Sequence, residues 1–146
     1  RQKTILFRKA SDRMISFDGL KVAVLGLAFK PGTDDLREAP SLDNVALLLD
    51  KGADIYAYDP VAASNFEKIY PEGKNGKGSI TYVTCPQDAL KDANICFVFT
   101  EWQQIKELPE KLFKELMAIP LVYDGRNVFD NKKMSTLGIE YYSIGR

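Results

Sequence analysis

Histidine is absent from the 146-residue chain. Its absence excludes Ser-His-Asp and Cys-His catalytic groups and HExxH zinc sites, and it removes the side chain that most often acts as a general base near neutral pH. Any chemistry would therefore depend on cysteine, lysine or carboxylates, or on residues that lie outside this chain. The chain begins with Arg1 rather than Met, which favours the second possibility and indicates a fragment.

Cysteine is scarce as well. Cys85 and Cys96 fit neither a disulfide framework nor a CxxC metal site, so we expect no metal centre and a reducing, cytoplasmic location. Cys96 stands in an apolar run and is predicted to be a core residue, whereas Cys85 has no cation near it in sequence that would activate its thiol. We therefore assign neither cysteine a catalytic role.

Long apolar runs and an excess of one charge are also missing. No run approaches the roughly twenty residues that a membrane span needs, and no signal-peptide pattern is visible, so we expect no membrane contact. Twenty basic residues balance twenty acidic ones, which leaves no long-range field to attract nucleic acid. Recognition of a phosphate would have to be local.

From Leu20 onward, short apolar runs alternate with helical periods. This alternation predicts right-handed βαβ units and a Rossmann-like α/β fold, a three-layer, doubly wound parallel sheet of about six strands. The strands are expected at residues 21–26, 53–58, 80–83, 94–99, 120–123 and 138–144. The glycine-rich residues 71–79 are expected to form a flexible excursion. Residues 1–18 are interpreted as the tail of an interdomain helix or a linker, and residues 19–146 as the domain.

Helices are expected between these strands. The first follows Pro40, with Ser41 as its N-cap and Gly52 just past its end. The other helices are expected at residues 61–69, 86–91, 102–117 (divided by Pro109) and 131–137.

The polar loop after the first strand is the first candidate site, because open α/β sheets bind ligands at the carboxyl ends of their strands. It follows Gly26 but lacks the second glycine of a GxGxxG dinucleotide fingerprint. Lys30 and Arg37 flank a Pro-Gly-Thr turn, a pattern that suits two cations facing a diphosphate, with Asp34 and Asp35 orienting them. A solvated surface loop is the alternative.

Arg126, in the turn at residues 124–127, is the second candidate. It follows a later strand and is therefore expected at the same edge of the sheet, where its guanidinium suits a phosphate or a planar base. The alternative is an Arg-Asp pair that closes the turn.

Two further residues are interpreted as structural. Asp59, after the second strand, is expected to form a turn before Pro60, with ribose binding as the alternative. Trp102 is expected to be a packing or interface residue rather than a platform for a ligand.

Four motifs carry a resemblance to a known family. They are GLAFKPGTDDLREAPS at residues 26–41, AYDPV at 57–61, TEW at 100–102 and DGRN at 124–127. Over essentially residues 20–146 the chain resembles the C-terminal, UDP-sugar-binding domain of the UDP-glucose/GDP-mannose dehydrogenase family. The TEW motif is most similar to the UDP-glucose 6-dehydrogenase branch.

The resemblance implies two Rossmann-like domains joined by a long helix that dimerises. The N-terminal and central domains of the same enzyme would then be partners, and the whole protein would be a homo-oligomer. Such an enzyme oxidises the C6 alcohol of a UDP-sugar in two hydride transfers to NAD, through a cysteine-bound intermediate. By motif position, Phe29, Lys30 and Arg126 would bind the UDP-sugar substrate. Arg37 would contact the NAD cofactor, which the absent N-terminal domain would mainly hold.

The family's GxGxxG domain and its segment with the nucleophilic cysteine have no counterpart in this sequence. We therefore expect no catalytic residue in this chain and no turnover by the chain in isolation. Two alternatives stay open: a non-catalytic Rossmann-like module for nucleotide sensing or interaction, and a domain that mainly supplies a subunit interface.

Overall fold

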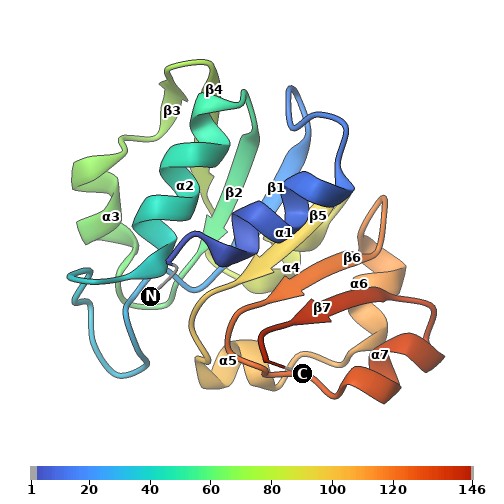
Figure 1. The fold of residues 1–146 in the computed structure, drawn as a ribbon. Helices are drawn as coiled ribbons and strands as arrows, with labels where there is room; N and C mark the ends of the chain where they lie inside the picture. The colour runs from blue at the N-terminus through green and yellow to red at the C-terminus, as the bar shows by residue number, and fades with distance from the viewer. Residues whose placement is uncertain (1–2, 146) are drawn as a thin grey trace.

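The computed structural model describes residues 3–145. One sheet contains the strands β1 (Lys21–Leu25), β2 (Asp54–Tyr58), β3 (Gly73–Asn75), β4 (Gly78–Tyr82), β5 (Ile95–Val98), β6 (Leu121–Asp124) and β7 (Glu140–Ser143). The helices are α1 (Ile5–Arg13), α2 (Pro40–Asp50), α3 (Ala63–Ile69), α4 (Pro86–Leu90), α5 (Gln103–Lys106), α6 (Lys111–Leu116) and α7 (Asn131–Thr136). Figure 1 shows the sheet running through the centre of the molecule between these helices.

The strand order of the sheet is β3-β4-β2-β1-β5-β6-β7. All neighbouring strands are parallel except β3 and β4. The chain runs outward from β1 to β4 and then crosses back to β5, which lies on the other side of β1. Helices therefore cover both faces: in Figure 1, α1 and α2 lie in front of the sheet and α4 behind it. The predicted three-layer, doubly wound α/β fold is confirmed.

The outer edge of β4 differs from the prediction. Residues 71–79, expected to be a flexible excursion, contain β3, which pairs antiparallel with β4 between Gly73↔Ile80 and Asn75↔Gly78. The turn between the two strands includes Gly76, whose φ is +60°. The flexible interpretation is wrong because these glycines provide a hairpin turn, and the hairpin pairs an otherwise open edge. The sheet therefore has seven strands rather than six.

Helix α2 begins two residues earlier than expected. Ala39 is the N-cap and Pro40 the first helical residue, which suits proline because its missing N–H would have no partner there. Ser41 is not the cap: it is buried, and its hydroxyl donates to Leu27 O at 2.6 Å. This hydrogen bond ties the helix to the chain that follows β1. Gly52 ends the helix with a φ of +85°, as predicted.

Helix α1, interpreted from the sequence as a tail or linker, packs onto the domain. Leu6, Phe7 and Ala10 form its buried face. The buried side chain of Asn44 in α2 holds its start. The Asn44 amide donates to Lys3 O at 2.8 Å, and its oxygen accepts from the Phe7 N–H at 3.0 Å.

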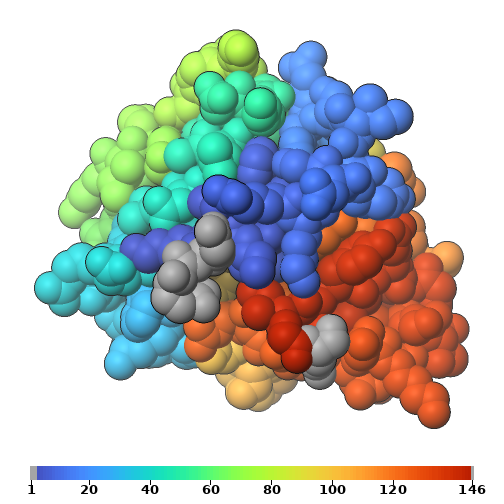
Figure 2. Space-filling model, viewed as in Figure 1, coloured from blue at the N-terminus to red at the C-terminus, as the bar shows by residue number. Residues whose placement is uncertain are grey.

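The other end of α1 contacts the last strand. Arg13 pairs with Glu140 at 2.8 Å, and Lys9 Nζ donates to Ser143 O at 3.3 Å. Figure 2 shows this arrangement as blue N-terminal atoms against red C-terminal ones. Residues 3–17 are therefore part of the packing of this domain.

Two residues that were predicted to have packing roles, Cys96 and Trp102, lie in the hydrophobic core. Cys96 is fully buried in β5, and this burial raises the pKa of its thiol well above the usual value. Trp102 is 8% exposed and packs in the core. Both predictions of a packing role are confirmed. None of the helices within residues 3–145 has the length and apolar character that crossing a membrane requires.

Candidate functional site

The switch point of the sheet lies between the carboxyl ends of β1 and β5, where the chain reverses its direction of winding. Gly26 follows β1 with a φ of +92°, a conformation that favours glycine. A Cβ atom at Gly26 would lie 2.5 Å from Thr100 Cβ. The Thr100 hydroxyl donates to Ala28 O at 2.6 Å. Gly26 therefore allows the loops after β1 and β5 to meet in direct contact.

Asp59, at the end of β2, organises the same edge. It is 5% exposed, and its carboxylate accepts five hydrogen bonds, from Leu27 N, Ala28 N, Val61 N, Ala62 N and Trp102 Nε1, at 2.7 to 3.0 Å. Backbone and indole N–H groups thus occupy both oxygens. The structural interpretation is confirmed and extended, because Asp59 also joins the loops after β1, β2 and β5.

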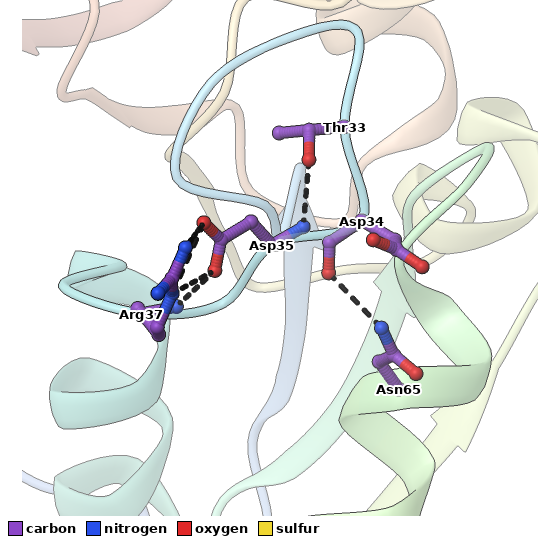
Figure 3. Close-up of polar contacts among 5 residues, drawn as sticks. All are labelled: Thr33, Asp34, Asp35, Arg37 and Asn65. Carbon is purple, nitrogen blue, oxygen red and sulfur yellow. Dashed lines mark hydrogen bonds and ion pairs between the residues drawn. The ribbon is translucent and has the colours of Figure 1, made fainter.

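The loop between Phe29 and Ala39 extends outward from this anchor. Its backbone closes on itself where the Phe29 N–H donates to Asp35 O at 3.0 Å. Figure 3 shows that the Asn65 side chain of α3 reaches the loop, with a hydrogen bond from its amide to Asp34 O at 3.2 Å. The loop is thus supported at its root and at one side.

Arg37 is oriented by a residue of its own loop. Its Nη2 donates to Asp35 Oδ2 at 2.9 Å and its Nε to Asp35 Oδ1 at 3.1 Å (Figure 3). Hydrogen bonds from the side chain and backbone of Arg37 lower the pKa of Asp35 from its usual 3.8 to about 2. The Arg37 side chain is nevertheless 89% exposed. The prediction that an acidic residue orients this cation is confirmed for Asp35.

Phe29 and Lys30 lie on the surface at the start of this loop. Phe29 is 42% exposed, one of the few large apolar side chains that solvent reaches. Lys30 is exposed too, and its ammonium makes no hydrogen bond or ion pair with any residue between 3 and 145. An exposed apolar ring and an unpaired cation in one loop are residue types that can contact a base or sugar and the phosphate attached to it.

The turn that carries Arg126 is built on a second buried aspartate. Asp124 ends β6, is fully buried, and accepts hydrogen bonds from Arg126 N, Val128 N, Phe129 N and the Tyr141 hydroxyl, at 2.6 to 3.1 Å. The next residues complete the turn: Asn127 has a φ of +53° and exchanges two hydrogen bonds with the backbone of Ile144. The backbone of Arg126 is thus fixed from both sides.

The Arg126 side chain pairs with Glu101 and not with the aspartate of its own turn. Arg126 Nη2 lies 2.8 Å from Glu101 Oε2. The alternative of an Arg-Asp pair that closes the turn therefore holds for the backbone alone, where the Arg126 N–H donates to Asp124. Burial acts to raise the pKa of Glu101, but the hydrogen bond from Arg126, the backbone N–H of Glu101 and the charge of Arg126 outweigh it and leave the pKa below its usual value. The other oxygen, Oε1, is buried and has no hydrogen-bond partner among the described residues.

A small pocket of about 110 Å³ lies beside Arg126. The start of α1 supplies one wall, with Lys3, whose ammonium pairs with Glu38 at 2.6 Å. Arg37 lines a different, shallower depression against α3. The structure therefore brings all four predicted residues to the carboxyl edge but divides them between two loops, after β1 and β6, that flank the loop of β5.

Three residues that contribute to this edge escaped the sequence interpretation: Glu101, Lys3 and Asn44. Glu101 stood in a recognised motif, but its partner follows a neighbouring strand and is distant in sequence. Lys3 and Asn44 act through α1, whose packing no local pattern indicated. Within residues 3–145, no cluster of three or more His, Cys, Asp or Glu side chains has the arrangement of a metal site.

The edge of β1 and β2 does not fit a dinucleotide cofactor held by this domain alone. In a Rossmann site the pyrophosphate approaches a glycine-rich turn, and an acidic side chain at the end of the second strand binds the ribose. Here Thr100 packs against that turn, and the carboxylate of Asp59 is already occupied by N–H groups. The guanidinium of Arg37, although paired with Asp35, stays exposed to solvent at this edge.

A doubly wound parallel sheet with cationic loops at its carboxyl edge defines a Rossmann-like ligand-binding domain. Comparison with known proteins identifies it further. The sequence model of the UDP-glucose/GDP-mannose dehydrogenase family, UDP binding domain, matches residues 23–131. The chain belongs to this family.

Individual relatives are consistent with this family assignment. The chain is 38% identical to UDP-glucose 6-dehydrogenase YwqF of Bacillus subtilis, over 99% of the chain and 32% of that protein. It is 40% identical to UDP-glucose 6-dehydrogenase of Pseudomonas aeruginosa, over 100% of the chain and 32% of that protein. The chain thus spans about a third of the length of these curated relatives.

Solved structures show the same fold. A UDP-glucose dehydrogenase from Pyrobaculum islandicum superposes with a TM-score of 0.74 and 31% identity, over 98% of the chain and 29% of that protein. An NDP-N-acetyl-D-galactosaminuronic acid dehydrogenase from Methanosarcina mazei superposes with a TM-score of 0.73 and 27% identity, over 99% of the chain and 28% of that protein.

Proposed function

We propose that this chain is the nucleotide-sugar-binding part of an NAD-dependent UDP-glucose 6-dehydrogenase, which converts UDP-glucose to UDP-glucuronate in two hydride transfers. Family membership and the names of the curated relatives support this substrate and reaction. N-terminal and central domains of the same enzyme are the proposed partners, in a homo-oligomer. In this proposal residues 19–146 are the UDP-sugar-binding domain, and residues 1–18 are the tail of the interdomain helix or a linker.

Phe29, Lys30 and Arg126 are proposed to contact the UDP-sugar. The observation that carries this proposal is the placement of two cation-bearing loops at one carboxyl edge, on either side of the β5 loop. Lys30 offers an unpaired ammonium to a diphosphate, and Phe29 an apolar surface beside it.

Arg37 is proposed to contact NAD across the cleft between domains. Its exposed guanidinium keeps donors that Asp35 does not use. A bound NAD would accept the hydride from the sugar alcohol. Residues of this chain would bind and orient the ligands. Its buried Cys96, whose pKa is raised, is unsuited to act as the nucleophile.

A binding measurement tests the substrate residues. We expect that UDP, titrated calorimetrically into the protein, binds about tenfold more weakly to Lys30→Gln and to Arg126→Gln, because each substitution removes a charge-assisted hydrogen bond. Lys74→Gln, in the exposed hairpin strand β3, is the matched control and should bind like the wild type. Equal affinities for all four proteins would contradict the proposed site.

A dehydrogenase assay tests whether the catalytic groups lie outside this chain. The 146-residue chain, supplied with UDP-glucose and NAD, should form no NADH above the background without enzyme. Enzyme-dependent NADH from this chain alone would show that its own residues suffice for turnover, and would overturn the proposal that the catalytic groups lie outside it.

A further inference from the structure

The ion pair between Glu101 and Arg126 joins two loops that leave the sheet side by side. Val98 of β5 and Asp124 of β6 are register partners at the last position of both strands. Glu101 lies three residues beyond one and Arg126 two residues beyond the other. Parallel strands thus bring the two side chains together at the edge where the nucleotide sugar is proposed to bind.

The pair is partly buried, unlike an ordinary surface ion pair. The Glu101 side chain is 31% exposed and that of Arg126 37%. Glu101 Oε1 is buried, so the carboxylate is held by its surroundings, and Oε2 accepts the hydrogen bond from Arg126 Nη2. The backbone of Arg126 is fixed in turn by the buried Asp124. Both ends of the contact are therefore immobilised.

Stability does not account for this arrangement. A buried carboxylate oxygen without a hydrogen-bond partner carries a desolvation penalty. An ion pair that is still about one-third exposed contributes little to folding in return. Groups held at such a cost are typical of functional sites, where a fixed geometry matters more than stability.

The pair also leaves part of the arginine available. Only Nη2 of the Arg126 side chain donates within residues 3–145. Its Nε and Nη1 have no acceptor there, and the guanidinium borders the pocket beside α1. Because the guanidinium is planar, fixing Nη2 also fixes the direction in which the remaining donors point.

We propose that Glu101 is a positioning residue: its carboxylate holds the Arg126 guanidinium in the orientation in which the free donors meet the nucleotide sugar. This inference rests on the proposed function, in which Arg126 contacts that ligand. Pre-orientation strengthens binding because the arginine does not lose its rotational freedom when the ligand arrives.

The direction in which one substitution changes the affinity for UDP distinguishes positioning from simple electrostatics. Glu101 is an anion beside a site for an anionic ligand, so Coulomb repulsion alone predicts tighter UDP binding when the charge is removed. Positioning predicts the opposite. We expect that Glu101→Gln weakens UDP binding about fivefold, because the neutral amide holds the guanidinium by a weaker hydrogen bond.

A second variant separates charge from geometry. Glu101→Asp keeps the negative charge but withdraws it by one methylene, so positioning predicts a loss of affinity similar to that of Glu101→Gln. Glu107→Gln, at the C-cap of α5, removes the same charge from an exposed carboxylate outside the site. This control should bind UDP within about twofold of the wild type, because an exposed distant charge is screened.

Calorimetric titration of UDP into the protein, together with thermal melting, provides the test. Positioning requires weaker binding by both Glu101 variants, without a lower melting temperature for Glu101→Gln. It also requires that Glu101→Gln has no further effect once Arg126→Gln is present, since the two residues act as one unit. A purely structural role would instead lower the melting temperature and leave the two effects on affinity additive.

The outcomes also distinguish this inference from the proposed function. If the wild type does not bind UDP, or if Arg126→Gln binds like the wild type, the proposed role of Arg126 fails and the inference fails with it. If Arg126→Gln weakens binding but Glu101→Gln leaves it unchanged or tightens it, the proposed function stands and the positioning role is overturned.

Discussion

Arg37 and Arg126 lie at the same edge of one sheet, yet they are held in opposite ways. Arg37 pairs with Asp35, two residues earlier in its own loop, and its side chain is 89% exposed. Arg126 pairs with Glu101, 25 residues away on the neighbouring loop, and is 37% exposed.

The difference indicates different tasks. An exposed side chain held by its own loop moves with that loop, and it can follow a ligand that another domain presents. A side chain held between the ends of two strands keeps one position, so it suits a ligand that binds to this domain in one fixed orientation. The proposed assignments, Arg37 to NAD and Arg126 to the UDP-sugar, correspond to these two behaviours.

The largest loss of folding stability should come from a substitution at Gly26, where the loops after β1 and β5 are in contact. Gly26→Ala adds a Cβ atom at a φ of +92°, 2.6 Å from the backbone nitrogen of Thr100, and we expect it to destabilise the fold by about 3–5 kcal/mol. Gly32→Ala, also at positive φ but with open space around it, is the matched control and should cost only about 1–2 kcal/mol. Equal losses in chemical denaturation would show that the contact with Thr100 is not tight.

A smaller loss is expected when the anchors are changed one at a time. Asp59→Asn replaces an acceptor of five hydrogen bonds and should reduce stability by roughly 3 kcal/mol, because it leaves buried donors unpaired. It should also shift the fluorescence of Trp102, whose indole N–H donates to Asp59.

Asp124→Asn is the matched comparison for Asp59→Asn. It should destabilise by a similar amount, roughly 3 kcal/mol, but leave the fluorescence of Trp102 unchanged, because Asp124 anchors the other loop. If both variants altered the fluorescence equally, the two loops would not be held independently, and the contrast between the two arginines would lose its structural basis.

The smallest effect on stability should come from the pair of Asp35 and Arg37, and it should be seen at acidic pH. The pKa of Asp35 lies at about 2, below its usual 3.8, so its pairing with Arg37 stabilises the fold above pH 3.8 and is lost as the pH falls towards 2. Because the pair is exposed, we expect little change of melting temperature at neutral pH in Arg37→Gln.

Carboxyl carbon NMR measures this titration directly. Arg37→Gln should return the pKa of Asp35 towards 3.8, since the arginine provides the main hydrogen bonds that lower it. Arg126→Gln, which changes the other pair, should leave the Asp35 titration where it is. A pKa of 3.8 for Asp35 in the wild type would contradict the local pairing of Arg37.

Several parts of this edge could be predicted from the sequence because they depend on residues close together in the chain. Asp35 was a candidate partner for Arg37 because both belong to one short loop. The hairpin at residues 71–79 is the contrary case, since glycines indicated flexibility where β4 offered an edge to pair with. The cap of α2 was misplaced because the Ser41 hydroxyl found a tertiary acceptor, Leu27 O.

The sequence by itself determined the alternation of strands and helices, and hence the edge at which the polar loops of this protein emerge. Local periodicity and turn residues suffice for that. Only the tertiary structure decided that β5 lies between β1 and β6, and therefore that Glu101 meets Arg126 while Thr100 meets Gly26. The order of parallel strands depends on how the crossover helices pack, and residues distant in sequence decide that packing.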